Sequence, residues 1–524
     1  MRNVHLLATI LFALFINSLL AQPFEIDPFF GENGEIVLPQ NNPVFVTAKD
    51  QMLILTTEAH QLQLERMTRD GAFDANFGDN GKITLNFDQR VSAGIIREQA
   101  DGRILIIGAV RDSLEKSHLL LIRLLENGQL DFIFEHQEVV LSNPLGINNS
   151  ISNAAIQKDS QLILVGQQYT RRADGFTFDR NCLLMRVNLD GQLDTTFGNQ
   201  GIVLTNFDNR GGNFSEVAIT QDGKIITAGD FENKLRERDW SLARFTADGV
   251  RDSTFGRNGI VTMNIDLAND FLTYMEVLED DRILMGGSAL NRIKSDIALI
   301  RFTSNGQIDS TFGNQGMVLT DISGKNNPVL RSSDRPTSII RRLDGRILVC
   351  GHTHTIKSLS DYRSFFLQYT ADGHLDQDFG DNGLFIMGSW DSLHLSSLAL
   401  QSDGKILARG GEKIVTGRHN FIRRYLPDFK VSQITSLLAN GTSLIYPNPI
   451  KKGATLEYTL DNPEVLTIRL LDLHGRIVAT YLQNTPKQAG VYQQLIELPN
   501  SSPKGMYFVR LSSPNGQMMI KVMK

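Results

Sequence analysis

Short runs in which apolar residues alternate with polar ones fill most of the chain. Residues 201–249 show the arrangement, because the β-rich runs GIVLTNF, SEVAIT, KIITAGD and WSLARFT are separated by loops and by the turn QDG. Asp-Gly between two such runs predicts a β-hairpin, since Gly accepts the positive φ that the turn requires. The chain shows no convincing amphipathic helix, so the pattern predicts an all-β protein.

The same unit recurs along the chain roughly every 60 residues, which is typical of an array of supersecondary units rather than of one enzyme fold. A Phe-Gly step marks the copies, at Phe30-Gly31, Phe77-Gly78, Phe197-Gly198, Phe255-Gly256, Phe312-Gly313 and Phe379-Gly380, and a degenerate copy has Phe134 followed by Glu135. Four short strands per unit predict a seven-bladed β-propeller. A solenoid also suits the period, but the first copy reads as a half-unit that awaits its partner at the far end.

One copy of the motif, DGQLDTTFGNQG at 190–201, could be mistaken for a metal loop. Its recurrence favours a structural role, in which Phe and Leu anchor between units, Gly permits the tight turn and Asp satisfies turn amides. The oxygen-bearing side chains of the motif are spaced less densely than in an EF-hand loop, which argues against a metal site there. Each unit also has an Arg or Gln at one equivalent place, and we expect it to pair with the Asp of the Leu-Asp step: Arg66, Arg123, Arg186, Arg244, Arg301, Gln368 and Arg424.

The N-terminal segment, the net charge and the two cysteines indicate where the protein is located and which classes of partner it does not fit. Residues 1–21 have a basic start, a short apolar core and a small residue at Ala21, which predicts a cleaved signal peptide. No later segment is apolar enough to span a membrane. A net charge of −6, concentrated in the body of the chain, argues against nucleic-acid binding. Cys182 and Cys350 stand far apart in the sequence, and we expect buried free thiols rather than a disulfide.

The repeats resemble the delta-60 repeat family, whose units carry a DGxLDxxFGxxG signature, over roughly residues 25–428. We therefore expect the propeller to occupy residues 22–428, followed by a linker at 429–443. Residues 444–524 alternate apolar and polar positions between short turns and predict a small Ig-like β-sandwich.

This last segment resembles the type A C-terminal sorting domain of the type IX secretion system. The motifs that carry the resemblance are YPNP, DLHGR, KGMYFVRL and a basic C-terminus, with the residues Tyr446, Pro447, Asn448, Pro449, Asp472, Gly475, Arg476, Gly505 and Tyr507. The resemblance implies contact with the type IX machinery, export through the outer membrane of a Gram-negative cell, and a secreted or surface-anchored product.

Candidate chemistry is sparse. No GxSxG, HExxH or Walker motif occurs. His352 and His354 could share one strand face as metal ligands, and Glu135–Glu138 brings carboxylates into the degenerate turn, but a structural or solvated role is simpler for both. We expect no catalytic residue, no metal and no cofactor.

The loops between hairpins vary from unit to unit, and variable loops on a rigid scaffold are where recognition normally lies. They mix cations and aromatic residues, at Arg171, Arg172, Phe176, Lys234, Arg236, Arg238, Trp240, Lys357, Tyr362 and Arg363. The sequence therefore predicts a monomeric, non-catalytic binding, adhesion or scaffold module whose variable face takes an anionic glycan or an acidic protein. The alternative is a polysaccharide-active or other hydrolytic enzyme with its site in the propeller funnel.

Overall fold

The computed structural model describes residues 26–426 and 444–523 with internal gaps. The gaps are at 33, 41, 112, 114–116, 132–138, 142–148, 172–177, 208–210, 267, 292–293, 323–331, 356–361, 390–392, 415–416, 447–449, 451–452, 461, 472–476, 500–505 and 514–515. The predicted signal peptide and the predicted linker therefore lie outside the described residues. One compact unit spans Gly34–Tyr425, and the described residues from 444 onward belong to a second.

The described part of the chain is all-β, as predicted. In the larger unit the first sheets are four-stranded and antiparallel: β2 (Val44–Val46), β3 (Met52–Glu58), β4 (Gln61–Met67) and β5 (Lys82–Asn86); β6 (Arg90–Glu98), β7 (Ile104–Arg111), β8 (Ser117–Leu124) and β9 (Val139–Leu141); β10 (Asn149–Ile156), β11 (Leu162–Arg171), β12 (Phe178–Val187) and β13 (Ile202–Thr205); β14 (Gly212–Ile219), β15 (Ile225–Glu232), β16 (Arg238–Phe245) and β17 (Ile260–Met263).

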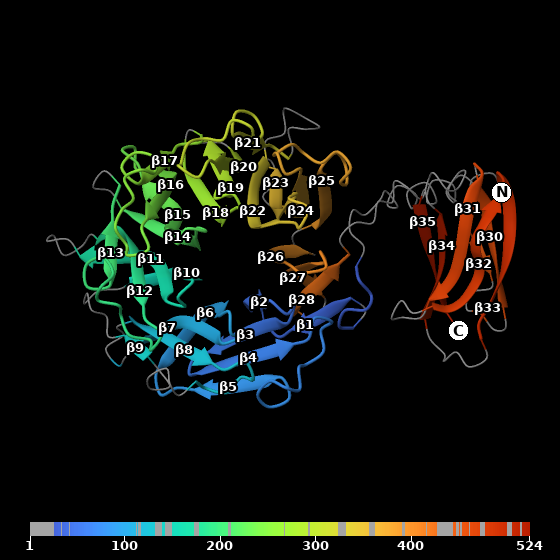
Figure 1. Ribbon diagram of the computed structural model, residues 1–524, viewed down its shortest axis with the longest axis horizontal. Helices are drawn as coiled ribbons and strands as arrows, with labels where there is room; N and C mark the ends of the chain where they lie inside the picture. The colour runs from blue at the N-terminus through green and yellow to red at the C-terminus, as the bar shows by residue number, and fades with distance from the viewer. Residues whose placement is uncertain are drawn as a thin grey trace. The chain divides into compact units, whose positions relative to one another are not determined.

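An eight-stranded sheet follows, made of β18 (Asp270–Val277), β19 (Ile283–Asn291), β20 (Lys294–Phe302), β21 (Met317–Thr320), β22 (Ser332–Arg341), β23 (Ile347–Thr355), β24 (Tyr362–Tyr369) and β25 (Leu384–Ser389). Its two halves meet through one parallel residue pair, Ser295 with Ser333. Figure 1 shows the sheets side by side around a centre, with β2, β6, β10, β14, β18 and β22 innermost.

The chain closes this ring with its own N-terminal strand. β1 (Glu35–Leu38) is the outer strand of a sheet otherwise made of β26 (His394–Leu400), β27 (Ile406–Ile414) and β28 (Gly417–Tyr425). It pairs antiparallel with β28, and this sheet also reaches the first one, because Arg424 Nη1 donates to the Arg69 carbonyl over 2.6 Å. The half-unit at the start of the sequence therefore does find its partner at the far end.

Hairpins form where the sequence has Asp-Gly, and also where it lacks the Gly. Gly223 in the turn between β14 and β15 has a φ of 86°. The equivalent positions in two other units hold Ser160 and Asp281, whose φ angles of 68° and 60° show that the chain accepts the left-handed conformation without glycine there. Turn geometry is thus imposed by the strands on either side, since such φ values are unfavourable for non-glycine residues.

The Phe-Gly step joins neighbouring sheets. Phe197 is fully buried, and Gly198 N donates to the carbonyl of Asp248 in the next unit over 3.1 Å. The Phe197 ring fills the space beside Gly249, where an added Cβ would lie 2.7 Å from the ring. Asp194 Oδ1 accepts from the Thr196 amide over 3.0 Å. These contacts confirm that the motif at 190–201 is structural.

The predicted Arg-to-Asp pairing is confirmed in Arg66–Asp74, Arg123–Asp131, Arg186–Asp194, Arg244–Asp252 and Arg301–Asp309, with Nε–Oδ2 distances of 2.7–2.9 Å. Each Arg is buried and also reaches the next unit; Arg301 Nη1, for example, donates to the Ala371 carbonyl over 3.0 Å. Arg301 lies 4.7 Å from the centre of the Phe312 ring as well. At the position without Arg, Gln368 Nε2 donates to Asp376 Oδ2 over 2.8 Å.

The second unit contains two sheets around one apolar core. One sheet holds β29 (Leu444–Tyr446), β30 (Gly453–Leu460) and β33 (Gly490–Glu497), and the other holds β31 (Glu464–Leu471), β32 (Ile477–Lys487), β34 (Met506–Ser513) and β35 (Gly516–Met523). Leu456, Ile468 and Val509 lie in their shared core. Tyr507 is buried in β34, and Tyr446 lies in β29. The other sorting-motif residues, Pro447–Pro449, Asp472, Gly475, Arg476 and Gly505, fall outside the described residues.

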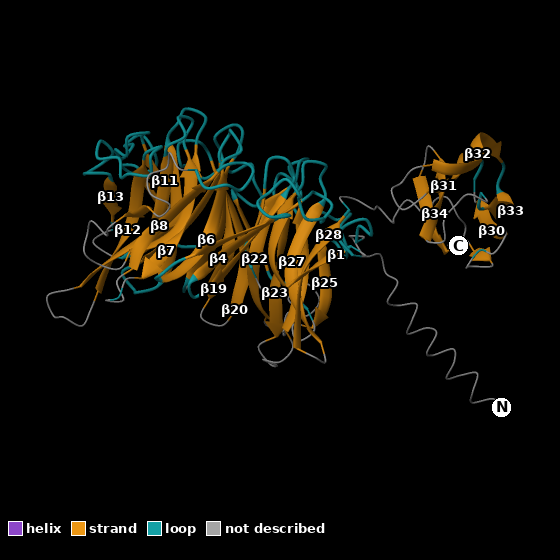
Figure 2. Ribbon diagram, turned by 90° about the horizontal axis from the view of Figure 1, so that it is seen from below, coloured by secondary structure: helices purple, strands orange, loops and turns teal. Residues whose placement is uncertain are grey.

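Alternating strand directions separate two faces of the ring, seen edge-on in Figure 2. The Asp-Gly and Phe-Gly turns lie at one end of the strands, here called the turn face. The connections between second and third strands, and between one unit and the next, lie at the other end, here called the loop face. Across the described residues, none belongs to a helix that is long and apolar enough to cross a membrane.

Candidate functional site

The predicted cations of the loop between β15 and β16 are displayed on the loop face. Asn233 closes this loop, because its Oδ1 accepts from the amides of Leu235 and Glu237 over 2.8 and 3.0 Å. Lys234 and Arg236 are exposed at its tip. Arg238 is only half exposed, and its Nη1 lies 3.2 Å from Asp230 Oδ2. The loop therefore presents two cations in a defined position.

Trp240 does not belong to this surface, contrary to the prediction. It is 1% exposed and packs in the apolar core with Leu242 and Phe255, because alternate side chains of β16 point into the interface between sheets. Arg363 is exposed on β24. Arg171 and Tyr362 lie in strands, but their side chains are outside the described set, as are Arg172, Phe176 and Lys357 altogether.

A hollow on the loop face was not predicted from the sequence. Its volume is about 400 Å³, and it opens between the ends of β3, β6 and β7. Arg90 and Arg111 line it together with Glu58, Thr57 and Ser92. Among the described residues, two guanidinium groups and one carboxylate line the hollow. Arg90 is the first residue of β6 and Arg111 is the last residue of β7. Neither lies in a recognisable motif, so the sequence did not point to them.

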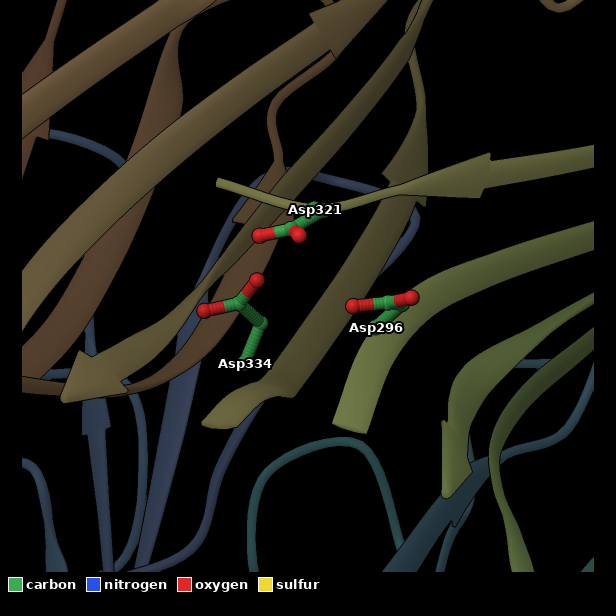
Figure 3. Close-up of side chains that lie close together, drawn as sticks. All are labelled: Asp296, Asp321 and Asp334. Atoms are coloured by element: carbon green, nitrogen blue, oxygen red, sulfur yellow. The ribbon is translucent and has the colours of Figure 1, made fainter. Parts of the chain in front are cut away.

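Three carboxyl groups gather at the loop-face end of β20. Asp296 lies on β20, Asp321 directly follows β21 and Asp334 lies on β22. One oxygen from each falls within 4.8 Å of the others, and Figure 3 shows the groups clustered between these strands. Lys294 Nζ lies 2.7 Å from Asp321 Oδ2 and 3.0 Å from Asp296 Oδ2. We call these four residues the acidic cluster.

Hydrogen bonds hold the deepest carboxylate of the acidic cluster in place. Asp334 is fully buried, and its Oδ1 accepts from Thr353 Oγ1 over 2.5 Å while its Oδ2 accepts from the Ile322 amide over 2.8 Å. Burial raises the pKa of Asp334 to about 7 against these bonds, with Asp321 adding to the rise. Burial also raises the pKa of Asp296, although Lys294 opposes the shift.

In the preceding unit, the positions equivalent to the three carboxylates of the acidic cluster hold a different set of side chains. There Asp239, Asn264 and Asp270 replace the three carboxylates of the acidic cluster, and Asn264 Nδ2 donates to Asp239 Oδ1 over 2.8 Å. Asp270 accepts from the Ile265 amide over 2.8 Å, as Asp334 does from Ile322, and burial raises its pKa to about 7. The acidic cluster therefore differs from its repeat by the change of an amide to a carboxylate and by the presence of Lys294.

The innermost strands carry a second set of non-repeating polar residues. Arg97 Nε donates to the Ala154 carbonyl over 2.7 Å, and Asn153 Nδ2 donates to Glu216 Oε2 over 2.8 Å. Burial raises the pKa of Glu216 to about 7, against the opposing effect of Arg97. Further round the ring, the Tyr274 hydroxyl donates to Glu276, whose Oε1 accepts from Arg341 Nε over 3.0 Å.

His352 and His354, the pair considered as metal ligands in the sequence, have lowered pKa values. Burial and nearby Arg335 lower the pKa of His352 to about 4, and the pKa of His354 is lowered for the same reasons. Where the structure describes side chains, the group spaced to hold a metal is Asp296, Asp321 and Asp334, and it includes neither His. Cys182 and Cys350 are buried free thiols, as predicted.

Comparisons with known families agree with this architecture. Residues 444–524 match the family model described as a secretion system C-terminal sorting domain. Residues 99–131, 220–255, 278–312 and 343–379 match a domain of unknown function, DUF5122, described as a beta-propeller. No curated protein sequence matches the chain.

Solved structures resemble it only distantly. Polysaccharide lyase Uly1 is 12% identical with a TM-score of 0.42, over 76% of this chain and 92% of that one. A PL25 ulvan lyase bound to -[GlcA(1-4)Rha3S]- is 12% identical with a TM-score of 0.42, over 78% and 96%. A glucose dehydrogenase is 10% identical with a TM-score of 0.33, over 64% and 98%. Similarity at this level carries no functional argument.

The repeat name suggested by the sequence is consistent with DUF5122. The chain thus carries DUF5122 β-propeller repeats and a type IX C-terminal sorting domain, and it is a secreted or cell-surface protein of a Gram-negative bacterium.

Proposed function

We propose that this protein is a non-catalytic, seven-bladed β-propeller that binds an anionic glycan on its loop face at the cell surface. In the larger unit, each four-stranded sheet is one blade, and the eight-stranded sheet is two blades joined at Ser295 and Ser333. The propeller occupies residues 22–428 and the linker 429–443. The two-sheet domain at 444–524 is Ig-like and serves export.

The contrast between the two faces carries the proposal. On the turn face, the Arg, Asp, Phe and Gly residues of the repeat bond to neighbouring blades. On the loop face, Lys234 and Arg236 project into solvent and Arg90 and Arg111 line a hollow. A volume of about 400 Å³ lies in the usual range of small-ligand sites. Guanidinium groups bind carboxylate and sulfate with two parallel hydrogen bonds, which suits an anionic sugar.

A binding experiment with the full secreted chain tests this proposal. Acidic and neutral glycans are arrayed, and binding is measured at low and physiological salt. We expect acidic glycans to bind in a salt-sensitive way, and Arg90→Ala with Arg111→Ala to weaken binding at least tenfold. The matched control removes two exposed turn-face cations, Arg251→Ala with Arg257→Ala, and should change affinity less than twofold.

Equal losses in the two double variants would contradict a loop-face site. Absence of binding to any glycan would overturn the glycan proposal and direct the search to acidic proteins.

A second candidate function rests on Glu216. A half-buried carboxyl group with a pKa of about 7 is suited to general acid-base work, and Tyr274, Glu276 and Arg341 lie on neighbouring inner strands. If the propeller cleaves the glycan that it binds, incubation should produce new chain ends, and Glu216→Gln should abolish them without loss of binding. Unchanged glycan after long incubation excludes this candidate.

Export can be tested separately. A chain that ends at residue 443 lacks the sorting domain, and we expect it to accumulate in the periplasm while the full chain reaches the surface or the medium. Equal amounts of both forms outside the cell would show that residues 444–524 are not needed for export.

A further inference from the structure

We propose that Arg469 and Arg510 of the C-terminal sorting domain together bind one phosphate monoester group on the outer face of its four-stranded sheet. Arg469 lies on β31 and Arg510 on β34. The two strands pair antiparallel, and these two residues are directly opposite one another in the register. The Cβ atoms of such a pair are about 5 Å apart, so both guanidinium groups start from neighbouring positions. The proposal concerns a different domain from the glycan site and does not depend on it.

Both arginines lie on the face of the sheet that points away from the apolar core. Their neighbours along the two strands, Ile468, Leu470 and Val509, are fully buried in that core. Successive side chains of a strand point to opposite faces, so Arg469 and Arg510 share the outer face. β31 and β34 are the two central strands of this sheet, and both arginines are half-buried. The pair therefore lies in the middle of the outer face, partly withdrawn from water.

Unsatisfied donors are the second, independent argument. The Nε atoms of Arg469 and Arg510 are both buried, and neither has a hydrogen-bond partner in the part of the chain that the structure describes. Neither arginine forms an ion pair with a described carboxylate. Like charges directly opposite one another destabilise a pair of strands, and a buried donor without an acceptor costs further free energy. An anion bound between the two arginines would remove both penalties.

The propeller shows how an arginine at a cross-strand position is satisfied within the fold. Arg423 on β28 is directly opposite Glu35 on β1, and its Nε lies 2.5 Å from Glu35 Oε2. Opposite charges at such positions stabilise the pairing of the strands. In the sorting domain a second arginine takes the place that the carboxylate has there, so the negative charge has to come from outside the described residues.

A phosphate monoester matches the pair in charge and in shape. It carries a charge of about −2 at pH 7 and three acceptor oxygens, whereas a single carboxylate carries half that charge. A guanidinium group binds phosphate through two parallel hydrogen bonds, so two opposed guanidinium groups can hold one phosphate from both sides. Because the protein is exported to the cell surface or beyond, the group can come from a lipid headgroup or from a soluble phosphate ester.

Phosphate binding by the full chain, purified with the sorting domain retained, tests the site. Inorganic phosphate is titrated at physiological salt, and phosphatidylcholine vesicles with and without phosphatidic acid form the lipid arm. At ten times its dissociation constant, phosphate should raise the thermal midpoint of the sorting domain by roughly 5 °C, since a ligand that binds only the folded state stabilises it. Binding to the vesicles that contain phosphatidic acid identifies a lipid headgroup as the source, and binding to inorganic phosphate alone identifies a soluble ester. Absence of both would overturn the proposal.

Arg469→Gln and Arg510→Gln are the decisive variants, because each removes one charge from the pair on a different strand. We expect each to weaken phosphate binding at least tenfold and to lose the thermal shift. The double variant should lose little more, since both arginines hold the same group. Lys487→Gln is the control: it removes a cation that lies 4.9 Å from the centre of the Tyr492 ring in the same domain, and it should keep the affinity within twofold.

The same variants separate a binding site from a purely structural pair. Without phosphate, Arg469→Gln and Arg510→Gln should melt at or above the wild-type temperature, because the repulsion between the two strands is removed. Lower midpoints in phosphate-free buffer would show that the arginines stabilise the fold by themselves, and wild-type phosphate affinity in the double variant would exclude them as ligands. Tighter binding of an aspartate-rich peptide than of phosphate would overturn the phosphate assignment in favour of an acidic protein.

Discussion

Strand β20 ends in two charged groups with opposite properties. At the turn-face end, Arg301 pairs with Asp309 over 2.7 Å, and Thr311 and Arg282 also donate to that carboxylate. These bonds lower the pKa of Asp309 although burial opposes them. At the loop-face end, burial raises the pKa of Asp296 and Asp334, and Lys294 contacts Asp296 and Asp321. One strand therefore has at one end an ion pair whose bonds lower a carboxyl pKa, and at the other end carboxyl groups whose pKa values are raised by burial.

The difference separates scaffold from candidate site. The Arg301 pair recurs in other blades with the same atoms and nearly the same distances, so its role is common to all of them. The acidic cluster occurs once among the described blades, because the preceding blade replaces Asp321 with Asn264. A feature that departs from the repeat needs an explanation beyond the scaffold, and perturbed carboxyl pKa values often mark functional sites.

The largest effect is expected from breaking the turn-face pair. Arg301→Ala leaves Asp309 buried without its main partner, and we expect a loss of about 3–5 kcal/mol in the free energy of unfolding. Urea denaturation followed by tryptophan fluorescence measures it. Arg301→Gln should cost less, because Gln368 already bonds to Asp376 at the equivalent place. Equal losses for both variants would show that charge, rather than hydrogen bonding, holds the joint.

A comparison of two glycines, Gly223 and Gly249, next tests the packing of the buried Phe197 ring between blades. Gly223 and Gly249 have similar φ angles of 86° and 81°, but nothing lies within 4 Å of a Cβ at Gly223, whereas Phe197 lies 2.7 Å from a Cβ at Gly249. Gly223→Ala should cost about 1–2 kcal/mol for the left-handed backbone. Gly249→Ala should cost about 1–3 kcal/mol more through overpacking. Equal thermal midpoints would contradict the close inter-blade contact.

The smallest effect concerns pH at the loop face. The folded-state pKa of Asp270 is raised to about 7, above its unfolded value, so the folded state holds more protons between about pH 4 and 7. Its contribution to stability is therefore lost as the pH rises through this window. Asp270→Asn should flatten the fall in thermal midpoint between pH 5 and 8.

The control for this experiment is Asp222→Asn. The hydrogen bond from Thr220 lowers the pKa of Asp222 to about 2, so this carboxyl group titrates below the range from pH 5 to 8. An unchanged pH dependence in Asp270→Asn would show that Asp270 remains ionised in the folded protein.

Much of the scaffold could be predicted from the sequence because its signals are local and repeated. Asp-Gly steps marked hairpins, and the fixed spacing between Arg186 and Asp194 predicted an ion pair that is present at 2.7 Å. Residues eight apart across one tight turn meet whatever the rest of the chain does. The free thiols were predicted on another ground, because Cys182 and Cys350 stand far apart in the sequence, and both are buried and unpaired with one another.

The candidate sites were harder to predict. Trp240 was placed on the binding surface by its type and its neighbours, but its strand position directs it into the core. Arg90 and Arg111 line one hollow because the first residue of β6 pairs with the last residue of β7. Glu216 and Glu276 read as ordinary strand residues until the inner strands come together.

By itself, the sequence determined the all-β class, the repeat, the sorting domain and the turn-face contacts, because each depends on residues close together in the chain. The sequence also predicted that the first half-unit joins the far end, but only the tertiary structure decided that the single strand β1 closes the last sheet, that Trp240 is buried and that Asp296, Asp321 and Asp334 meet. The physical reason is that burial and charge density depend on which strands become neighbours in space. Local patterns specify strands and turns, whereas the electrostatics of the loop face arise only when the blades pack.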